Sequence, residues 1–119
     1  MKKFISFFIA LFVLFFLMAI PVFAMDISFE WDPNSESDLA GYRLYQSGTS
    51  GSYTFGAGNE VMAVLAGTEI GTLVGVMDGK WYWVLTAYDS QGNESGPSNE
   101  VSASIDQTAP APPTNLQFQ

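Results

Sequence analysis

Apolar and polar positions alternate along most of this chain after residue 25, with the period of two that is typical of β-strands. In the stretch 27–31, Ile27, Phe29 and Trp31 share one face while polar residues occupy the other. Turn-forming residues interrupt the alternation roughly every 8–12 positions, and no stretch combines helix caps with a repeat of about 3.6 residues. An all-β fold is therefore predicted, with strands over 27–31, 42–46, 53–55, 60–65, 68–74 and 81–88, and a last strand that ends near residue 105.

The stretch 81–88 shows how the alternation assigns the two faces of a strand. Trp81, Trp83 and Leu85 fall on one face, and Tyr82 and Tyr88 fall on the other. We place the tryptophan face inward because a large aromatic side chain removes roughly 150–250 Å² from water. Together with the inward positions of the other strands, the predicted core consists of Phe29, Trp31, Tyr42, Leu44, Trp81, Trp83 and Leu85.

The first 24 residues differ in composition from the rest. Lys2 and Lys3 precede an almost wholly apolar run from 4 to 20, and the segment ends in the small residue Ala24. This order is that of a secretory signal peptide and predicts cleavage after Ala24. An uncleaved membrane anchor stays open as the alternative, although about 17 apolar residues lie at the lower limit for spanning a bilayer. The mature chain, 25–119, has the length of one domain.

Charge and two missing residue types exclude several classes of function. Without Lys2 and Lys3, only Arg43 and Lys80 oppose 12 carboxylates, and so acidic a surface repels phosphate backbones, which argues against a nucleic-acid partner. The chain has no histidine and no cysteine. Ser–His and Cys–His catalysis, the usual zinc sites and disulfide bridges are therefore excluded. A small sandwich filled with aromatic side chains also leaves no cleft for a catalytic carboxylate pair, so the chain is not expected to be an enzyme.

Two parts of the chain resemble strand pairs of a bacterial fibronectin type III domain. The segment 31–34 (Trp-Asp-Pro-Asn) leading into 39–45 resembles strands B and C, and 81–89 running into 92–101 resembles strands F and G. The resemblance covers residues 26–106 and implies an immunoglobulin-like Greek-key β-sandwich of six to seven strands, with the domain at 25–106. In this family, strand F opens with a tyrosine that makes the tyrosine-corner hydrogen bond. Trp81 stands at that position here, and an indole N–H donates but does not accept.

The resemblance also points to a missing strand. The family places strand A before strand B, but all seven residues from Met25 to Trp31 are needed for strand B, so one edge of that sheet would be bare. After strand G, a Pro-rich tail at 107–119 resembles a linker followed by strand A of a next domain, with Leu116 and Phe118 on one face. Three interpretations stay open: the free tail of a truncated tandem array, a fold-back onto the same molecule, and donation of the tail to a second copy, which would make the chain a homo-oligomer.

A calcium site is one candidate for the loops. In the family fold the B–C and F–G loops emerge at the same end, and oxygen-bearing side chains in flexible loops suit Ca²⁺. The candidate ligands are Asp32, Asn34, Glu36, Asp38, Asp89, Asn93 and Glu94. Their spacing matches no EF-hand, and Asp and Asn also stabilise turns through their own backbones, so both interpretations stay open.

Carbohydrate binding by aromatic rings on an exposed sheet face is a second candidate. Strands C and F are neighbours in the family, which would bring Tyr45 together with Tyr82 and Tyr88. Cross-strand pairing that supports the sheet explains the same three residues.

The expected function is that of a non-catalytic module without a cofactor, secreted or held at the cell envelope, that serves adhesion, spacing or protein contact. No membrane contact is expected after cleavage. This expectation comes from the family resemblance, because a fold does not fix a function. The alternatives are a self-assembling subunit that donates its tail and a carbohydrate-binding accessory module.

Overall fold

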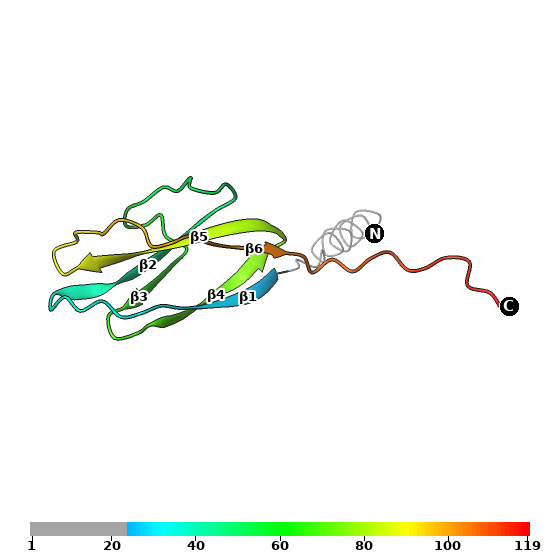
Figure 1. Cartoon of the computed structure of the whole chain (residues 1–119), viewed down its shortest axis with the longest axis horizontal. Helices are drawn as coiled ribbons and strands as arrows, with labels where there is room; N and C mark the ends of the chain where they lie inside the picture. Colours follow the sequence, from blue (N-terminus) through cyan, green and yellow to red (C-terminus); the bar gives the residue numbers. More distant parts are fainter. Residues whose placement is uncertain (1–23) are drawn as a thin grey trace, which may run out of the picture.

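The computed structural model describes residues 24–119, which form six strands in two antiparallel sheets and contain no helix (Figure 1). The larger sheet has the order β3-β2-β5-β6, and the smaller sheet pairs β1 with β4. The strands are β1 (Ala24–Glu30), β2 (Leu39–Ser47), β3 (Met62–Leu65), β4 (Ile70–Met77), β5 (Gly79–Asp89) and β6 (Val101–Ile105). The predicted all-β class is confirmed, and the two sheets pack as a β-sandwich. Residues 1–23, which hold most of the predicted signal peptide, lie outside the described residues.

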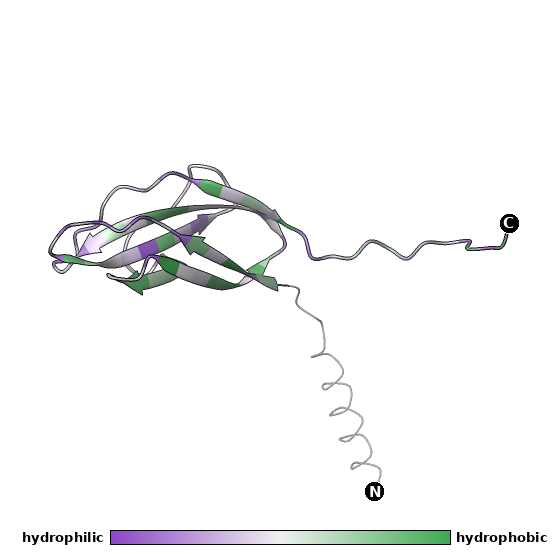
Figure 2. Ribbon diagram, turned by 60° about the horizontal axis from the view of Figure 1, so that its bottom comes forward, coloured by the Kyte–Doolittle hydropathy of each residue, from purple (hydrophilic) through white to green (hydrophobic). Residues whose placement is uncertain are grey.

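The strands follow the alternation of the sequence, which Figure 2 shows as green and pale or purple bands along each ribbon. Asp78 alone separates β4 from β5, and Gly79 begins β5 with a φ of 138°, in the range that favours glycine. Glycine is also required at position 41, because a Cβ atom there would lie 2.3 Å from the carbonyl oxygen of Val64 on the neighbouring strand β3. In the part of the chain that the structure describes, no helix is long and apolar enough to cross a membrane.

One predicted strand is wrong. Residues 53–55 belong to the loop between β2 and β3 and form no ladder. Instead, the loop lies over the outer face of the larger sheet, where the ring of Phe55 meets the ring of Tyr45 edge to face at 5.0 Å. Polar and Gly-rich residues flank this stretch on both sides. Phe55, which stays 43% exposed, covers Tyr45 through a ring contact that does not require backbone pairing.

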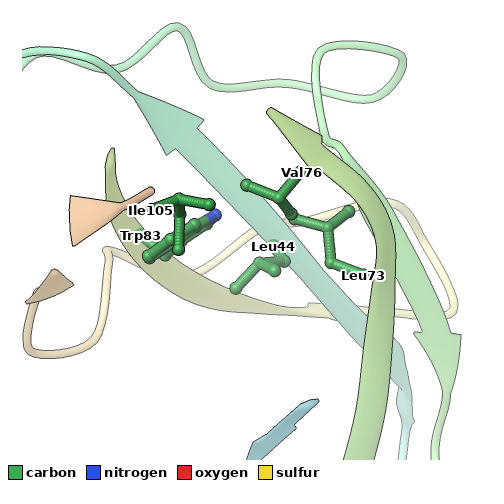
Figure 3. Packing of buried hydrophobic residues seen from close by; sticks show 5 residues of the cluster. All are labelled: Leu44, Leu73, Val76, Trp83 and Ile105. Carbon is green, nitrogen blue, oxygen red and sulfur yellow. The ribbon is translucent and has the colours of Figure 1, made fainter. Parts of the chain in front are cut away.

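The core between the sheets is centred on Trp83, whose exposed fraction is 1%. Leu44, Ile105 and, from the smaller sheet, Leu73 and Val76 surround it (Figure 3). Three further predicted core residues pack against this cluster while remaining partly exposed: Phe29, Trp81 and Leu85. Phe29 meets Trp83 edge to face at 5.4 Å. The other two predicted core residues, Tyr42 and Trp31, form a second aromatic pair at 5.3 Å, with Tyr42 buried and Trp31 half-buried.

Candidate functional site

The connection between β5 and β6 is fixed to the larger sheet by a cluster around Glu94. Arg43 on β2 forms an ion pair with the Glu94 carboxylate, and the Tyr45 hydroxyl donates to the same carboxylate at 2.7 Å. The Gly56 N–H donates to the Tyr45 hydroxyl at 3.1 Å, and the Arg43 guanidinium lies 3.9 Å from the centre of the Tyr88 ring. We call Arg43, Tyr45, Tyr88 and Glu94 the polar clamp, since it ties two loops to one sheet face.

The electrostatics of the polar clamp favour a charged Glu94 and a neutral Tyr45. Burial alone would raise the pKa of Glu94, but hydrogen bonds from Tyr45 and Arg43 and the Arg43 charge outweigh it and hold this pKa below its usual value. Burial, followed by the hydrogen bond to Glu94, raises the pKa of Tyr45. The hydrogen bond to Glu94 raises the pKa of Arg43. These directions describe a structural ion pair rather than a proton-transfer site near neutral pH.

A second carboxylate fixes the loop between β2 and β3. Glu100 accepts hydrogen bonds from the Ser50 hydroxyl at 2.5 Å, the Gly51 N–H at 2.8 Å and the Tyr53 hydroxyl at 2.6 Å. These bonds lower the pKa of Glu100, whereas burial, then the bond to Glu100, raises that of Tyr53. The loop that covers Tyr45 is therefore held in its first part by Glu100 and near its middle by the Tyr45 hydroxyl.

Six of the seven calcium candidates line one pocket of about 260 Å³ at the loop pole, all except Asp32. Two of their carboxylates already have partners. The Asp89 carboxylate accepts from the Asn93 backbone and side chain at 2.9 Å each, which lowers its pKa, and Glu94 belongs to the polar clamp. Between residues 24 and 119, no group of three acidic side chains is arranged to hold a metal ion. Calcium binding stays a prediction from the sequence.

The three tyrosines of the carbohydrate hypothesis do not form an exposed aromatic face. Tyr45, which the hypothesis needs on the surface, is instead 1% exposed beneath Phe55. Tyr88 is half-buried under the Arg43 guanidinium, and the Lys80 ammonium lies 5.5 Å from the ring centre of Tyr82. The sequence pattern missed this arrangement because it did not show that a loop and two cations cover the outer face.

Trp81 occupies the place where the resemblance expects a corner tyrosine. Its indole N–H donates to the carbonyl oxygen of Met77 at 2.8 Å, so it bonds back to the residue before the β4–β5 turn. A donor-only group is sufficient here, because the partner is a backbone acceptor. Trp81 thus closes this turn with a tryptophan hydrogen bond while its ring packs against the core.

The lateral edge of the sandwich where β1 and β6 lie is open within residues 24–119. Among residues 24–119, β1 pairs only with β4, and β6 pairs only with β5, so each strand has one edge without a partner. A cavity of about 110 Å³ lies between these strands. Its apolar lining comes from Phe29, Trp31, Leu44, Trp83, Val84, Leu85 and Val101. We call this cavity and the outer edge of β1 the open groove.

The tail after β6 runs away from the sandwich as an extended segment (Figure 1). The side chains of Leu116 and Phe118 are 99% and 104% exposed. Asn115, just before them, has a φ of 57°, a left-handed conformation that asparagine tolerates better than most residues. The predicted apolar face of the tail is present in the sequence but packs against nothing in the described part of its own molecule.

Comparisons with known proteins include a likeness to a solved structure. No family model matches the chain, and neither does any curated protein. The crystal structure of a β-1,2-glucanase from Parabacteroides distasonis is similar, with 26% sequence identity and a TM-score of 0.57 over 75% of this chain. The match covers only 12% of the glucanase chain, so this chain corresponds to a small part of that protein.

Proposed function

We propose that this chain is an exported, non-catalytic module of the fibronectin type III kind that serves spacing or protein contact at the cell envelope. The strand order supports this proposal. In an immunoglobulin-like sandwich, strands B and E share one sheet while C, F and G share the other. Here β1 and β4 take the places of B and E, and β2, β5 and β6 take those of C, F and G.

The observation that carries the proposal is the size of the structural match. A unit similar to most of this chain makes up 12% of a much larger solved protein. Such a unit therefore occurs as one segment of a longer chain. The side chains add support, since the best-formed polar cluster is an ion pair that fixes loops. The glucanase activity belongs to that whole protein and is not carried over.

A carbohydrate-binding accessory role is the second candidate, favoured by the name of the similar protein. The burial of Tyr45 and the cations over Tyr82 and Tyr88 count against it, because stacking on a sugar needs an exposed ring face. Phe55, an exposed aromatic outside the candidate set, offers a matched control.

Expression of the full chain in a bacterial host tests the proposal. The protein is expected outside the cytoplasm, with the mass of a chain that begins at Met25. It should release no reducing ends from β-1,2-glucan. Retention of the full-length chain in the cytoplasm would refute export, and released reducing ends would refute the non-catalytic role. Slowed migration in gels that contain the glucan, lost in Tyr82→Ala and Tyr88→Ala but kept in Phe55→Ala, would favour the carbohydrate role instead.

A further inference from the structure

The outer edge of β1 carries backbone groups that can accept another strand. The Trp31 N–H donates to the Glu69 carbonyl oxygen at 3.0 Å, so the backbone of Trp31 faces β4. Because successive residues of a strand point their backbone groups to opposite sides, those of Ser28 and Glu30 face away from β4. Nothing in residues 24–119 pairs with them. Such an edge is a template for strand addition.

The cavity beside this edge can take an apolar side chain. It measures about 110 Å³ and is lined mainly by apolar groups of β1, β5 and β6. For scale, an apolar cavity of roughly 150 Å³ holds a benzene ring, so this one suits a branched aliphatic side chain or part of a phenyl ring. A strand laid along β1 would point alternate side chains into it.

The tail has the chemistry that this groove needs. Leu116 and Phe118 are two positions apart, so they lie on one face of an extended strand, and both are fully exposed. Between 107 and 119 there is no charged side chain, so an inserted tail adds no side-chain charge to an acidic molecule. Burying these two large apolar side chains removes apolar surface from water, which favours insertion.

The exit of the tail decides between its own groove and that of another copy. Ile105 pairs with Gly79 and Ala24 pairs with Met77, so the end of β6 and the start of β1 lie at the same pole. Asp78 holds the root of the tail there, accepting from the Gln107 N–H at 3.1 Å and the Thr108 hydroxyl at 2.8 Å. A tail that folded back from this pole would run parallel to β1.

Antiparallel pairing requires entry from the opposite pole. To enter its own groove there, the tail must first span the height of the sandwich with residues 106–113, which reach at most about 26–29 Å. A second copy stacked end to end presents its opposite pole directly to the outgoing tail, which points along the long axis of the molecule (Figure 1). The tail then enters without reversal and runs antiparallel to β1, as do the pairs within this molecule.

We infer that the segment 116–119 of one copy adds as a strand to the outer edge of β1 in a second copy, with Leu116 or Phe118 in the cavity. The segment has four residues, as many as β3. Each copy has one tail and one groove, so the contact is head-to-tail and generates an open chain rather than a closed dimer. The inference names a partner for the contact role proposed above. A chain that stays monomeric would overturn it and leave the exported, non-catalytic module intact.

The test uses the full chain in its exported form, a variant whose tail has lost its apolar face, and a matched control. Light scattering coupled to size exclusion over a range of concentrations is expected to show a ladder of oligomers, more extended at higher salt because screening weakens the repulsion between acidic copies. The variant L116D/F118D should be a folded monomer. Q117D/Q119D is the matched control with the same two charges on the other face of the tail, and it should keep the ladder.

A mixing experiment distinguishes strand donation from other association. Ser28→Pro removes an N–H that faces away from β4, so it should block the groove and leave the β1–β4 ladder in place. Alone, Ser28→Pro and L116D/F118D should each be monomeric. Mixed, they should form a 1:1 dimer and nothing larger, since one retains the tail and the other the groove.

Three results would overturn the inference: a parent that is monomeric at every concentration, a ladder that survives L116D/F118D, or a mixture that forms no dimer. A monomeric parent whose melting temperature falls in L116D/F118D would instead show that the tail occupies its own groove.

Discussion

The two sheets of this sandwich differ in how much of each is covered by other parts of the described chain. The outer face of the larger sheet is covered by a loop and fixed by the polar clamp, so that Tyr45 is buried beneath Phe55. The smaller sheet has two strands, and the β1 edge has no partner within residues 24–119. The covered side therefore contributes internal contacts, and the open side is the one we propose for contact with another molecule. Residues distant in sequence, such as Arg43 and Glu94, contact each other on the covered side. On the open side, the apolar tail of the same molecule extends away from the sandwich (Figure 1).

Removal of the shared core should have the largest effect, because both sides rest on it. Trp83→Ala takes away the ring that Phe29 of the smaller sheet contacts at 5.4 Å, and it should lower the free energy of unfolding by about 3–5 kcal/mol in urea titrations. Leu65→Ala is the control, since Leu65 is 73% exposed, and it should change the value by at most about 0.5 kcal/mol. A similar loss in both variants would mean that the two sheets do not depend on this core.

Neutralising the polar clamp should have the next largest effect. Glu94→Gln keeps the size of the side chain but leaves the half-buried Arg43 without its charged partner. It should cost about 1–3 kcal/mol, measured by the same urea titration. Glu30→Gln makes the same change on the open side, where Glu30 is exposed, and should be nearly neutral. If the two variants lose equal stability, the contrast between the sides is wrong.

Acid should act on the covered side through the same carboxylate. The pKa of Glu94 lies below its usual value of 4.5, so its stabilising effect is complete above that value and is lost as the pH falls through the lower, folded-state pKa. Protonation of the other carboxylates changes the overall repulsion in both proteins alike. From pH 6 to pH 3, the parent should therefore lose more stability than Glu94→Gln, by less than about 1.4 kcal/mol per pH unit. Parallel curves would contradict the assignment.

Much of the fold could be predicted from local pattern. The alternation in 81–88 is that of β5, and the turn before it lies between the predicted strands 68–74 and 81–88. The predicted strand at 53–55 failed because its apolar residues serve to cover Tyr45 and not to pair with a neighbour. Local alternation indicates which residues contact the sheet, but not whether they do so from a paired strand or from a loop.

The polar clamp could not be predicted in the same way. Arg43 and Glu94 lie 51 positions apart, and their meeting depends on the β2–β5 register together with the path of the connection after β5. The scarcity of cations was a signal for one of the two partners: Arg43 is one of only two basic residues after the first 24. With 12 carboxylates to choose from, the sequence does not identify the partner.

The placement of the start of β1 and the end of β6 at one pole also determines how the sandwich bears tension. The first residue of β1 and the last residue of β6 lie next to the same turn, at Met77 and Gly79. A pull between Ala24 and Ile105 therefore loads the outermost ladder bonds first and opens them one pair at a time, like a zipper. A pull between a donated tail and the β1 of its acceptor acts along two antiparallel strands instead, so that their bonds share the load together. Linked head to tail, such copies would resist stretching at their junctions in shear, the geometry in which short strands hold best.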